Sequence, residues 1–228
     1  MMDDKITTAY RKSKGIYDDV LTQSKWWSRL YIRLFWGGVD DTDIANRLLA
    51  YLPVDYSGRL LDVPVGTAAF TWKKYGALSS ASITCLDYSG DMLEQAKGRL
   101  GHAANIAFRQ GDVGDMPFAD ETFDTVLSMN GFHAFPDKEK AFSETYRVLK
   151  RGGSFLACFY ICGQSKITDF FVDSFLSKKG WFTPPFDTEE SLKNRLGNLY
   201  ENVDFHLDGS IVWFQCVKAN EKKHKSSN

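Results

Sequence analysis

The sequence lacks an excess of charge of either sign, because its 28 Lys and Arg residues are matched by 29 Asp and Glu residues. A broad nucleic-acid surface needs a basic excess, so we expect no nucleic acid as ligand. Apolar runs are short, and none reaches the roughly 20 residues that span a bilayer. The start of the chain, MMDDKITTAY, lacks the basic and apolar regions of a signal peptide. We therefore expect a cytoplasmic protein without a membrane span.

Cysteine is also scarce. The four cysteines, Cys85, Cys158, Cys162 and Cys216, mostly lie in apolar runs, where a buried reduced thiol is the usual state. We expect no metal centre. A length of 228 residues with 43% hydrophobic content is enough to bury one sizeable core but is tight for two.

Short apolar runs alternate with helical patterns from residue 59 onward, which is typical of strand–helix–strand units in a parallel sheet. The predicted strands are 59–64, 82–87, 105–110, 123–129, 154–161, 203–207 and 211–219. Only DGS separates the last two, which is too short for a crossover, so they should pair antiparallel.

Two segments between strands read as amphipathic helices. After the second strand, Ser89 is a candidate N-cap before an apolar stripe of Met92, Leu93, Ala96 and Leu100. Before the fifth strand, Phe142, Thr145, Tyr146 and Leu149 form a second stripe, with Gly152 and Gly153 as the stop signal.

We therefore predict an α/β fold of the Rossmann-like type, with a seven-stranded, mostly parallel sheet, a C-terminal antiparallel hairpin and helices on both faces. Residues 1–57 are predicted to form an aromatic-rich helical cap, 58–219 the ligand-binding domain and 220–228 a disordered tail. A lid insertion is expected at about 163–200. Its aromatic residues are Phe170, Phe171, Phe175, Trp181, Phe182 and Phe186, and those of the cap are Trp26, Trp27, Tyr31, Phe35 and Trp36.

The stretch RLLDVPVGTAAF, residues 59–70, combines a strand end with a glycine-containing turn. Such a turn lets backbone N–H groups approach a ligand closely, and Thr67 is predicted to start the helix behind it. Gly66 holds the middle glycine position, whereas Pro64 stands where a first glycine is usual and supplies no N–H group.

Two acids follow the next two strands. Asp87 closes the second strand, where a carboxylate can accept both hydroxyl protons of a ribose. Asp112, preceded by Gly111, follows the third strand, where it can accept from an adenine amino group. Ligands of such sheets bind at the carboxyl ends of the strands, so these acids and the turn should share one site.

The segments LLDVPVGTAAF, CLDYSGDMLEQAKGRL, RQGDVGDMPFADETFDTVLSMNGFHAFPD and KAFSETYRVLKRGGSFL occur in this order over about residues 58–160. Together they resemble the motifs of class I S-adenosylmethionine (SAM)-dependent methyltransferases, especially the ubiquinone/menaquinone-biosynthesis type, which includes many small-molecule methyltransferases. The resemblance implies SAM as cofactor, and Pro64 is a departure from it. The cofactor-binding residues that it implies are Asp62, Val63, Pro64, Gly66, Thr67, Asp87, Tyr88, Met92, Gly111, Asp112, Val113 and Asn130.

The resemblance further implies methyl transfer by in-line displacement to a small acceptor. Oxygen and carbon nucleophiles must lose a proton, and His133 is the only histidine near the expected site, so it is the candidate base, with a structural hydrogen bond as the competing interpretation. The aromatic residues of cap and lid suit a partly apolar or aromatic acceptor, although such residues often only pack.

Three alternatives remain open. Pro64 and Ala68 favour a non-catalytic SAM-binding or regulatory protein on the same fold. An oxidoreductase with a nicotinamide cofactor is disfavoured by the incomplete glycine set. A methyltransferase for a soft element would use Cys158 and Cys162, but an offset of four in an extended strand spans about 13 Å. The acceptor and the oligomeric state stay open.

Overall fold

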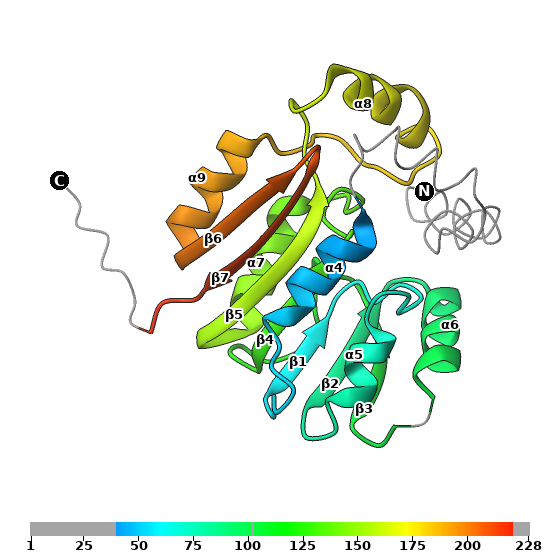
Figure 1. Ribbon diagram of the computed structural model, residues 1–228, viewed down its shortest axis with the longest axis vertical. Coiled ribbons are helices and arrows are strands. Elements are labelled where there is room, and N and C mark those ends of the chain that lie inside the picture. Colours follow the sequence, from blue (N-terminus) through cyan, green and yellow to red (C-terminus); the bar gives the residue numbers. More distant parts are fainter. Residues whose placement is uncertain (1–39, 102, 221–228) are drawn as a thin grey trace.

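The computed structural model describes residues 40–101 and 103–220, which form one seven-stranded sheet with the order β3-β2-β1-β4-β5-β7-β6 (Figure 1). β1 to β5 pair parallel, β7 pairs antiparallel with β5, and β6 pairs antiparallel with β7. The strands are β1 Arg59–Asp62, β2 Ser82–Asp87, β3 Ile106–Gln110, β4 Phe123–Met129, β5 Leu149–Tyr160, β6 Glu201–Asp208 and β7 Ile211–Val217. The predicted fold class is confirmed, including its C-terminal hairpin.

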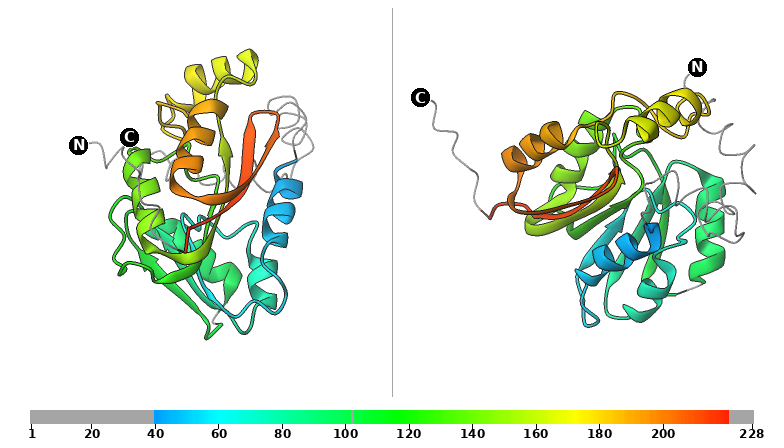
Figure 2. Two further views of the ribbon diagram at one scale, coloured as in Figure 1. Left: turned by 90° about the vertical axis from the view of Figure 1, so that its left-hand side faces the viewer. Right: turned by 45° about the horizontal axis from the view of Figure 1, so that its top comes forward.

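Helices cover both faces of this sheet (Figure 2). Those of one face share a hydrophobic cluster with Leu60 and Leu127, and those of the other share a cluster with Leu61 and Val126, as expected where neighbouring strand residues point to opposite faces. The first face carries α4 Asp41–Ala50, α5 Trp72–Ala77 and α6 Gly90–Leu100, and the second carries α7 Lys138–Val148 and α9 Glu189–Leu199.

α4 is the described part of the predicted N-terminal cap, and it packs on the sheet. Its side chains Ile44, Ala45, Leu48 and Leu49 are buried, and the helix contacts β5 and β7. The cap residues Trp26, Trp27, Tyr31, Phe35 and Trp36, and nearly all of the predicted tail, lie outside the described residues.

The helix after β2 begins as its sequence predicts, because the Ser89 side chain accepts a hydrogen bond from the Met92 N–H. The helix after β4 ends earlier than predicted. α7 stops at Val148, and Leu149 pairs with Phe123 as the first residue of β5. The prediction that Leu149 belongs to the helix was wrong, because pairing to β4 supersedes its helical spacing.

Gly152 and Gly153 were also wrongly predicted as the helix stop, since both lie within β5 at a register shift against β4. Gly152 has φ +71°, and a Cβ on Gly153 would lie 2.8 Å from the Lys150 carbonyl and 2.9 Å from the Asp124 carbonyl. The two glycines therefore allow the bulge that precedes the regular part of β5.

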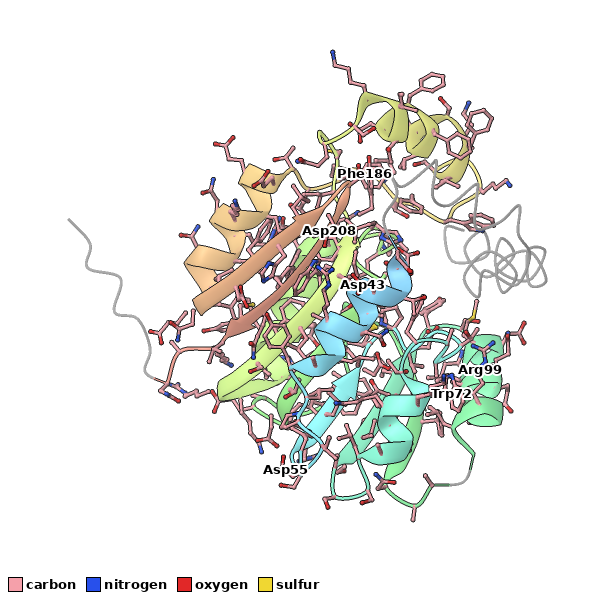
Figure 3. The ribbon with its side chains drawn as sticks, viewed as in Figure 1. Asp43, Asp55, Trp72, Arg99, Phe186 and Asp208 are labelled. Atoms are coloured by element: carbon pink, nitrogen blue, oxygen red, sulfur yellow. The ribbon has the colours of Figure 1, made fainter. Side chains whose placement is uncertain are left out.

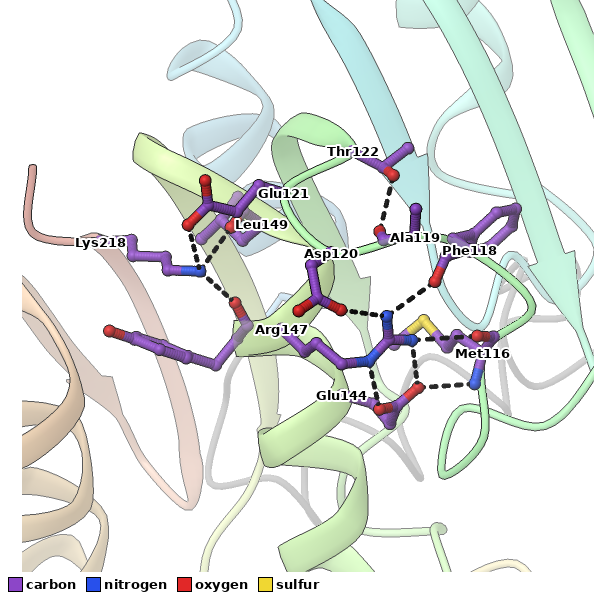
Figure 4. Close-up of polar contacts among 11 residues, drawn as sticks. Met116, Phe118, Ala119, Asp120, Glu121, Thr122, Glu144, Arg147, Leu149 and Lys218 are labelled. Carbon is purple, nitrogen blue, oxygen red and sulfur yellow. Dashed lines mark hydrogen bonds and ion pairs between the residues drawn. The ribbon is translucent and has the colours of Figure 1, made fainter.

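Arg147 connects α7 to the loop before β4 (Figure 4). Its guanidinium donates to the carbonyls of Met116 and Phe118 and binds the carboxylates of Asp120 and Glu144. Glu144 in turn accepts from the Met116 N–H at 2.8 Å. The two motifs GDMPFADETFD and RVLKRGG, which carry much of the resemblance, thus meet in a network that stabilises the fold.

The predicted lid insertion contains α8 Lys166–Phe171 and a π-helical turn, η1 Val172–Leu176, followed by an irregular stretch to α9. Val172 and Leu176 of its inner side are buried in the first-face cluster. Within residues 40–101 and 103–220, no helix has both the length and the apolar character needed to cross a bilayer.

The close carbonyl groups at Gly153 predict that adding one methyl group there lowers the stability of the protein. Gly153→Ala should lower the free energy of unfolding by about 1 to 3 kcal/mol, because two backbone oxygens of the bulge must move. Gly98→Ala is the control: its Cβ meets nothing within 4 Å, and alanine should stabilise this helical position by up to about 1 kcal/mol. Urea unfolding followed by circular dichroism measures both, and equal midpoints would contradict the prediction.

Candidate active site

A pocket opens at the carboxyl edge of the sheet beside β1, which lies between β2 and β4. The strands β2 and β3 follow on one side of β1, and β4 and β5 follow on the other. This is the topological switch point at which open α/β sheets bind ligands. The pocket is lined by residues 62–71, by Asp87, Tyr88, Ser89 and Met92, by residues 111–113, by residues 129–131 and by residues 134–136. All twelve predicted cofactor-binding residues are therefore together, although their contacts to a cofactor remain a prediction.

The loop after β1 is a series of turns, and α5 begins only at Trp72. The prediction that Thr67 starts the helix was wrong, since Ala68 adopts φ +57°, which a right-handed helix does not allow. Gly66 has φ +55°, and a Cβ there would meet nothing within 4 Å. The backbone at Gly66 thus borders open space in the pocket, as a close-approach position requires.

Asp87 fixes this loop to the end of β2. One carboxylate oxygen accepts from the Gly66 N–H at 2.8 Å, and the other accepts from the Ser89 N–H at 2.8 Å. Burial raises the pKa of Asp87 to about 6, while the two backbone hydrogen bonds oppose the rise. Each oxygen has a further lone pair, so the carboxylate can still accept from ligand hydroxyl groups.

Asp62 lies at the end of β1, where its carboxylate accepts a hydrogen bond of 2.7 Å from the Tyr75 hydroxyl. Burial raises the pKa of Asp62 to about 7, the hydrogen bond from Tyr75 opposes the rise, and the nearby Asp87 adds to it. Two buried carboxyls therefore share one end of the pocket. Tyr75 is a functional neighbour that the sequence did not indicate, because its role depends on how α5 packs.

Pro64 has a packing role that explains why a glycine is not needed there. A Cβ on Gly131 would lie 2.3 Å from Cδ of Pro64 and 2.8 Å from the Phe135 ring, so the proline ring covers the Gly131 backbone. The loop after β1 and the loop after β4 are thus in direct contact. The departure from the glycine pattern changes the wall of the pocket and leaves the pocket open.

The residues after β2, β3 and β4 complete the predicted set. Met92 and Val113 are buried, whereas the Tyr88 side chain is 44% exposed at the rim. Asp112 is exposed, and its carboxylate accepts from the Gly114 N–H at 2.8 Å. Asn130 has φ +55°, and its N–H donates to the Cys158 carbonyl, so a left-handed backbone turns the chain away from β4 into the pocket wall.

His133 does not line the pocket. Its Nδ1 accepts the Tyr160 N–H at 3.3 Å, and its ring stacks on Phe182 with centroids 4.0 Å apart. Burial and then the nearby Lys138 cation lower the pKa of His133 to about 3. This geometry supports the competing interpretation, in which a neutral imidazole makes a structural hydrogen bond, and a base role stays a prediction without support from these contacts.

Contacts around Thr183 connect the lid to the pocket wall. The Thr183 N–H donates to the His133 carbonyl, the Thr183 hydroxyl donates to the Ala134 carbonyl, and Lys138 donates to the Thr183 carbonyl. Ala134, Phe135 and Pro136 belong to the lining and were missed. Their position directly after β4, at the carboxyl edge of the sheet, was a usable signal.

None of the lid aromatics lines the pocket. Phe182 is buried, and Phe171, Trp181 and Phe186 are partly buried against the first-face cluster, so most of these rings pack, as one interpretation of the sequence held. The four cysteines are free thiols. In the part of the chain that the structure describes, no group of three or more His, Cys, Asp and Glu side chains is arranged for a metal ion.

Comparisons with known proteins cover the part of the chain that forms the pocket. Residues 61–157 match the model of a methyltransferase domain family. The ubiquinone/menaquinone biosynthesis C-methyltransferase of Geotalea daltonii is 35% identical over 113 residues, which are 48% of this chain and 47% of the relative. Residues 61–157 are thus similar to methyltransferase domains, as the resemblance to the class I SAM-dependent methyltransferases implied. The family model and the relatives imply SAM as the cofactor of this chain.

Further relatives differ in their acceptors. A demethylmenaquinone methyltransferase of Staphylococcus epidermidis is 36% identical over 109 residues, 47% of this chain and 45% of the relative. A malonyl-[acyl-carrier protein] O-methyltransferase of Geobacter sulfurreducens is 29% identical over 152 residues, 66% of this chain and 51% of the relative. The chain thus spans about half of the length of these curated relatives.

The solved structure of a SAM-dependent methyltransferase from Thermotoga maritima covers 93% of this chain and 99% of its own, with a TM-score of 0.67 and 18% identity. At that identity the likeness shows the fold. This methyltransferase fold agrees with the strand order and hairpin described above.

The pKa of Asp62 predicts a pH effect on stability. A buried carboxyl whose pKa is raised from 3.8 to about 7 stabilises the folded state fully below about pH 3.8, and this contribution is lost as the pH rises through about 7. Asp62→Asn should therefore gain stability relative to the parent between about pH 5 and about pH 8. Urea unfolding at both values measures the difference, with Asp55→Asn as the exposed control. Parallel curves for parent and Asp62→Asn would contradict the assignment.

Removal of the His133 acceptor should affect folding more than ligand binding. His133→Phe keeps a ring against Phe182 but leaves the buried Tyr160 N–H without its acceptor, so the free energy of unfolding should fall by about 1 to 3 kcal/mol. SAM affinity by calorimetry should stay within about twofold. His206→Phe is the matched control, because His206 also stacks on a ring, Trp213, but is partly exposed. Unchanged stability with a loss of methyl transfer of more than about a hundredfold would instead establish a base.

Proposed function

We propose that this chain transfers the methyl group of SAM to a small, partly apolar acceptor of the quinol type. The observation that carries the proposal is the pocket at the switch point, which gathers Asp87, Asp112, the Gly66 turn and Asn130 from four successive strand ends. The names of two relatives support the quinol type for the acceptor.

The residues fit the cofactor. We assign the ribose hydroxyls to Asp87, whose oxygens each keep a lone pair beside one backbone hydrogen bond. Asp112 and Val113 are assigned to the adenine amino edge, with Tyr88 and Met92 on its faces. Val63 and Pro64 shape the wall, Gly111 lets the chain pass close to the adenine, and Asp62, Gly66, Thr67 and Asn130 surround the methionine portion. The open space beside Gly66 supports this fit, because a side chain there would enter the pocket.

When bound, SAM supplies a methyl group already activated by a sulfonium, whose departure leaves a neutral thioether. The chain must then hold the acceptor in line with the methyl group and exclude water. Val65, Phe70, Met129 and Phe135 give the lining an apolar part that suits an aromatic ring. We propose that the part of the 163–200 insertion around Phe182 and Thr183, which contacts His133 and Ala134 beside the pocket wall, limits the access of water to the acceptor.

A non-catalytic SAM-binding protein is the second candidate. In the described part of the chain no histidine or lysine lines the pocket, and the carboxylates of the lining are assigned to the cofactor. An acceptor that must lose a proton would then have to be acidic itself, or be served by a base outside the described residues. Binding of SAM without turnover would favour this candidate.

The first test is calorimetric titration with SAM and with S-adenosylhomocysteine. We expect micromolar binding by the parent, and Asp87→Ala and Asp112→Ala should each weaken it at least tenfold, about 1.4 kcal/mol, because each removes a charged acceptor from the ligand. Asp55→Ala, far from the pocket, should bind as the parent does. Urea unfolding of each variant shows that the loss is not unfolding. Absence of binding by the folded parent would contradict the assignment of the site.

The acceptor is tested next with radiolabelled SAM under reducing conditions. A demethylated 1,4-naphthoquinol should be methylated, whereas malonyl-acyl carrier protein should not. The reverse result would replace the quinol type by the acid methylated by the third relative. Release of no methylated product from any acceptor, with SAM bound, would favour the non-catalytic candidate.

A further inference from the structure

The lid insertion exposes apolar side chains that its packing does not use. Ile167 is 81% exposed, Phe170 68% and Phe175 51%, and we call these three residues the lid patch. Another side of the same segment buries Thr168, Val172 and Leu176. α8 and η1 are therefore apolar on two sides, whereas an ordinary surface helix is apolar on one.

Three exposed cations lie at the two ends of this segment. Lys166 begins α8, and Lys178 and Lys179 follow η1. Of the two acids in the segment, Asp169 is engaged by the Tyr160 hydroxyl and the Gly163 N–H, and Asp173 is exposed. A helix that presents aromatic and aliphatic side chains between lysines has the composition of segments that lie in the interface of an anionic bilayer.

The segment formed by α8 and η1 lies close to the pocket. α8 starts shortly after the carboxyl end of β5, at the edge of the sheet that carries the pocket (Figure 1). Thr183 and Phe182, which follow the lid patch in the chain, contact His133 and Ala134 beside the pocket wall. A surface that binds α8 therefore lies next to the pocket.

We propose that the lid patch docks on the surface of an anionic phospholipid bilayer, so that an acceptor with an apolar tail can pass from the bilayer into the pocket. The docking rests on the described side chains, and the delivery of an acceptor rests on the proposed function. Aromatic rings enter the headgroup region, and Lys166, Lys178 and Lys179 bind the anionic headgroups. Residues 17–38 are a less suitable cover, because their three basic residues outnumber their two acids and they offer the lid lysines no net negative charge.

The test is co-sedimentation of the full chain with vesicles of phosphatidylcholine alone or with about a third of phosphatidylglycerol. The parent should bind the anionic vesicles, and binding should weaken with added salt. Ile167→Ser/Phe170→Ser/Phe175→Ser and, separately, Lys166→Gln/Lys178→Gln/Lys179→Gln should each reduce the bound fraction at least tenfold. Val54→Ser and Lys73→Gln/Lys74→Gln are the matched controls and should bind as the parent does. Val54 is 78% exposed, and its neighbour Asp55 lies at the far end of the molecule from α8 (Figure 3).

Parallel measurements separate this proposal from the proposed function. SAM affinity by calorimetry and turnover of a tail-less naphthoquinol should be unchanged in both triple variants, while turnover of a long-tailed quinol in vesicles should fall. Failure of the parent to bind anionic vesicles overturns the docking. The lid patch would then be covered by residues 17–38 or by a second copy of the chain. Light scattering distinguishes these two, because only the second copy doubles the mass in solution. Binding that the lid substitutions do not change overturns it as well. Absence of quinol turnover alone refutes the proposed function and leaves the vesicle result standing.

Discussion

The pocket depends on the two hydrogen bonds that Asp87 accepts from Gly66 and Ser89. They hold the turn after β1 against the start of α6, and they do so with a buried charged group whose pKa is raised to about 6. A buried carboxylate is costly unless its oxygens are bonded, so the loop and the acid stabilise each other only when both strand ends are in place. The parallel pairing of β1 with β2 supplies that placement.

Function and stability therefore oppose each other at this end of the sheet. The nearby Asp87 makes ionisation of Asp62 less favourable, yet both carboxyls line the pocket. The structure compensates elsewhere. Arg147 binds two carboxylates and two carbonyls, and none of the residues that supply them lines the pocket. The motifs by which the family is recognised are thus of two kinds: one kind builds the pocket, and the other fastens α7 to the loop before β4.

The strands, the C-terminal hairpin and most of the residues that line the pocket could be predicted from the sequence, because they follow from local features. An apolar run ending in Asp or Gly places that residue at the carboxyl edge, and parallel pairing then gathers all such ends. What failed depended on tertiary contacts. Leu149 has helical spacing but pairs with β4, and Thr67 lies in a turn because Ala68 is left-handed. His133 follows β4 in the chain, a position from which a base could reach the pocket. Its side chain instead contacts Tyr160 and Phe182, and the local sequence does not indicate this direction.

Pro64 shows how a departure from a family pattern is to be understood. A glycine at this position would leave the Gly131 backbone uncovered, whereas the proline ring fills that space and joins the first and last loops of the pocket. Pro64 has no backbone N–H group to donate. The N–H group of Gly66, two residues later, is present and donates to the Asp87 carboxylate. The pair of Pro64 and Gly131 works as a unit, because any larger residue at 131 would collide with the ring. Pro64 therefore shapes the pocket wall next to the loop after β4, whereas Gly66, Asp87 and Asp112 keep the residue types of the family pattern.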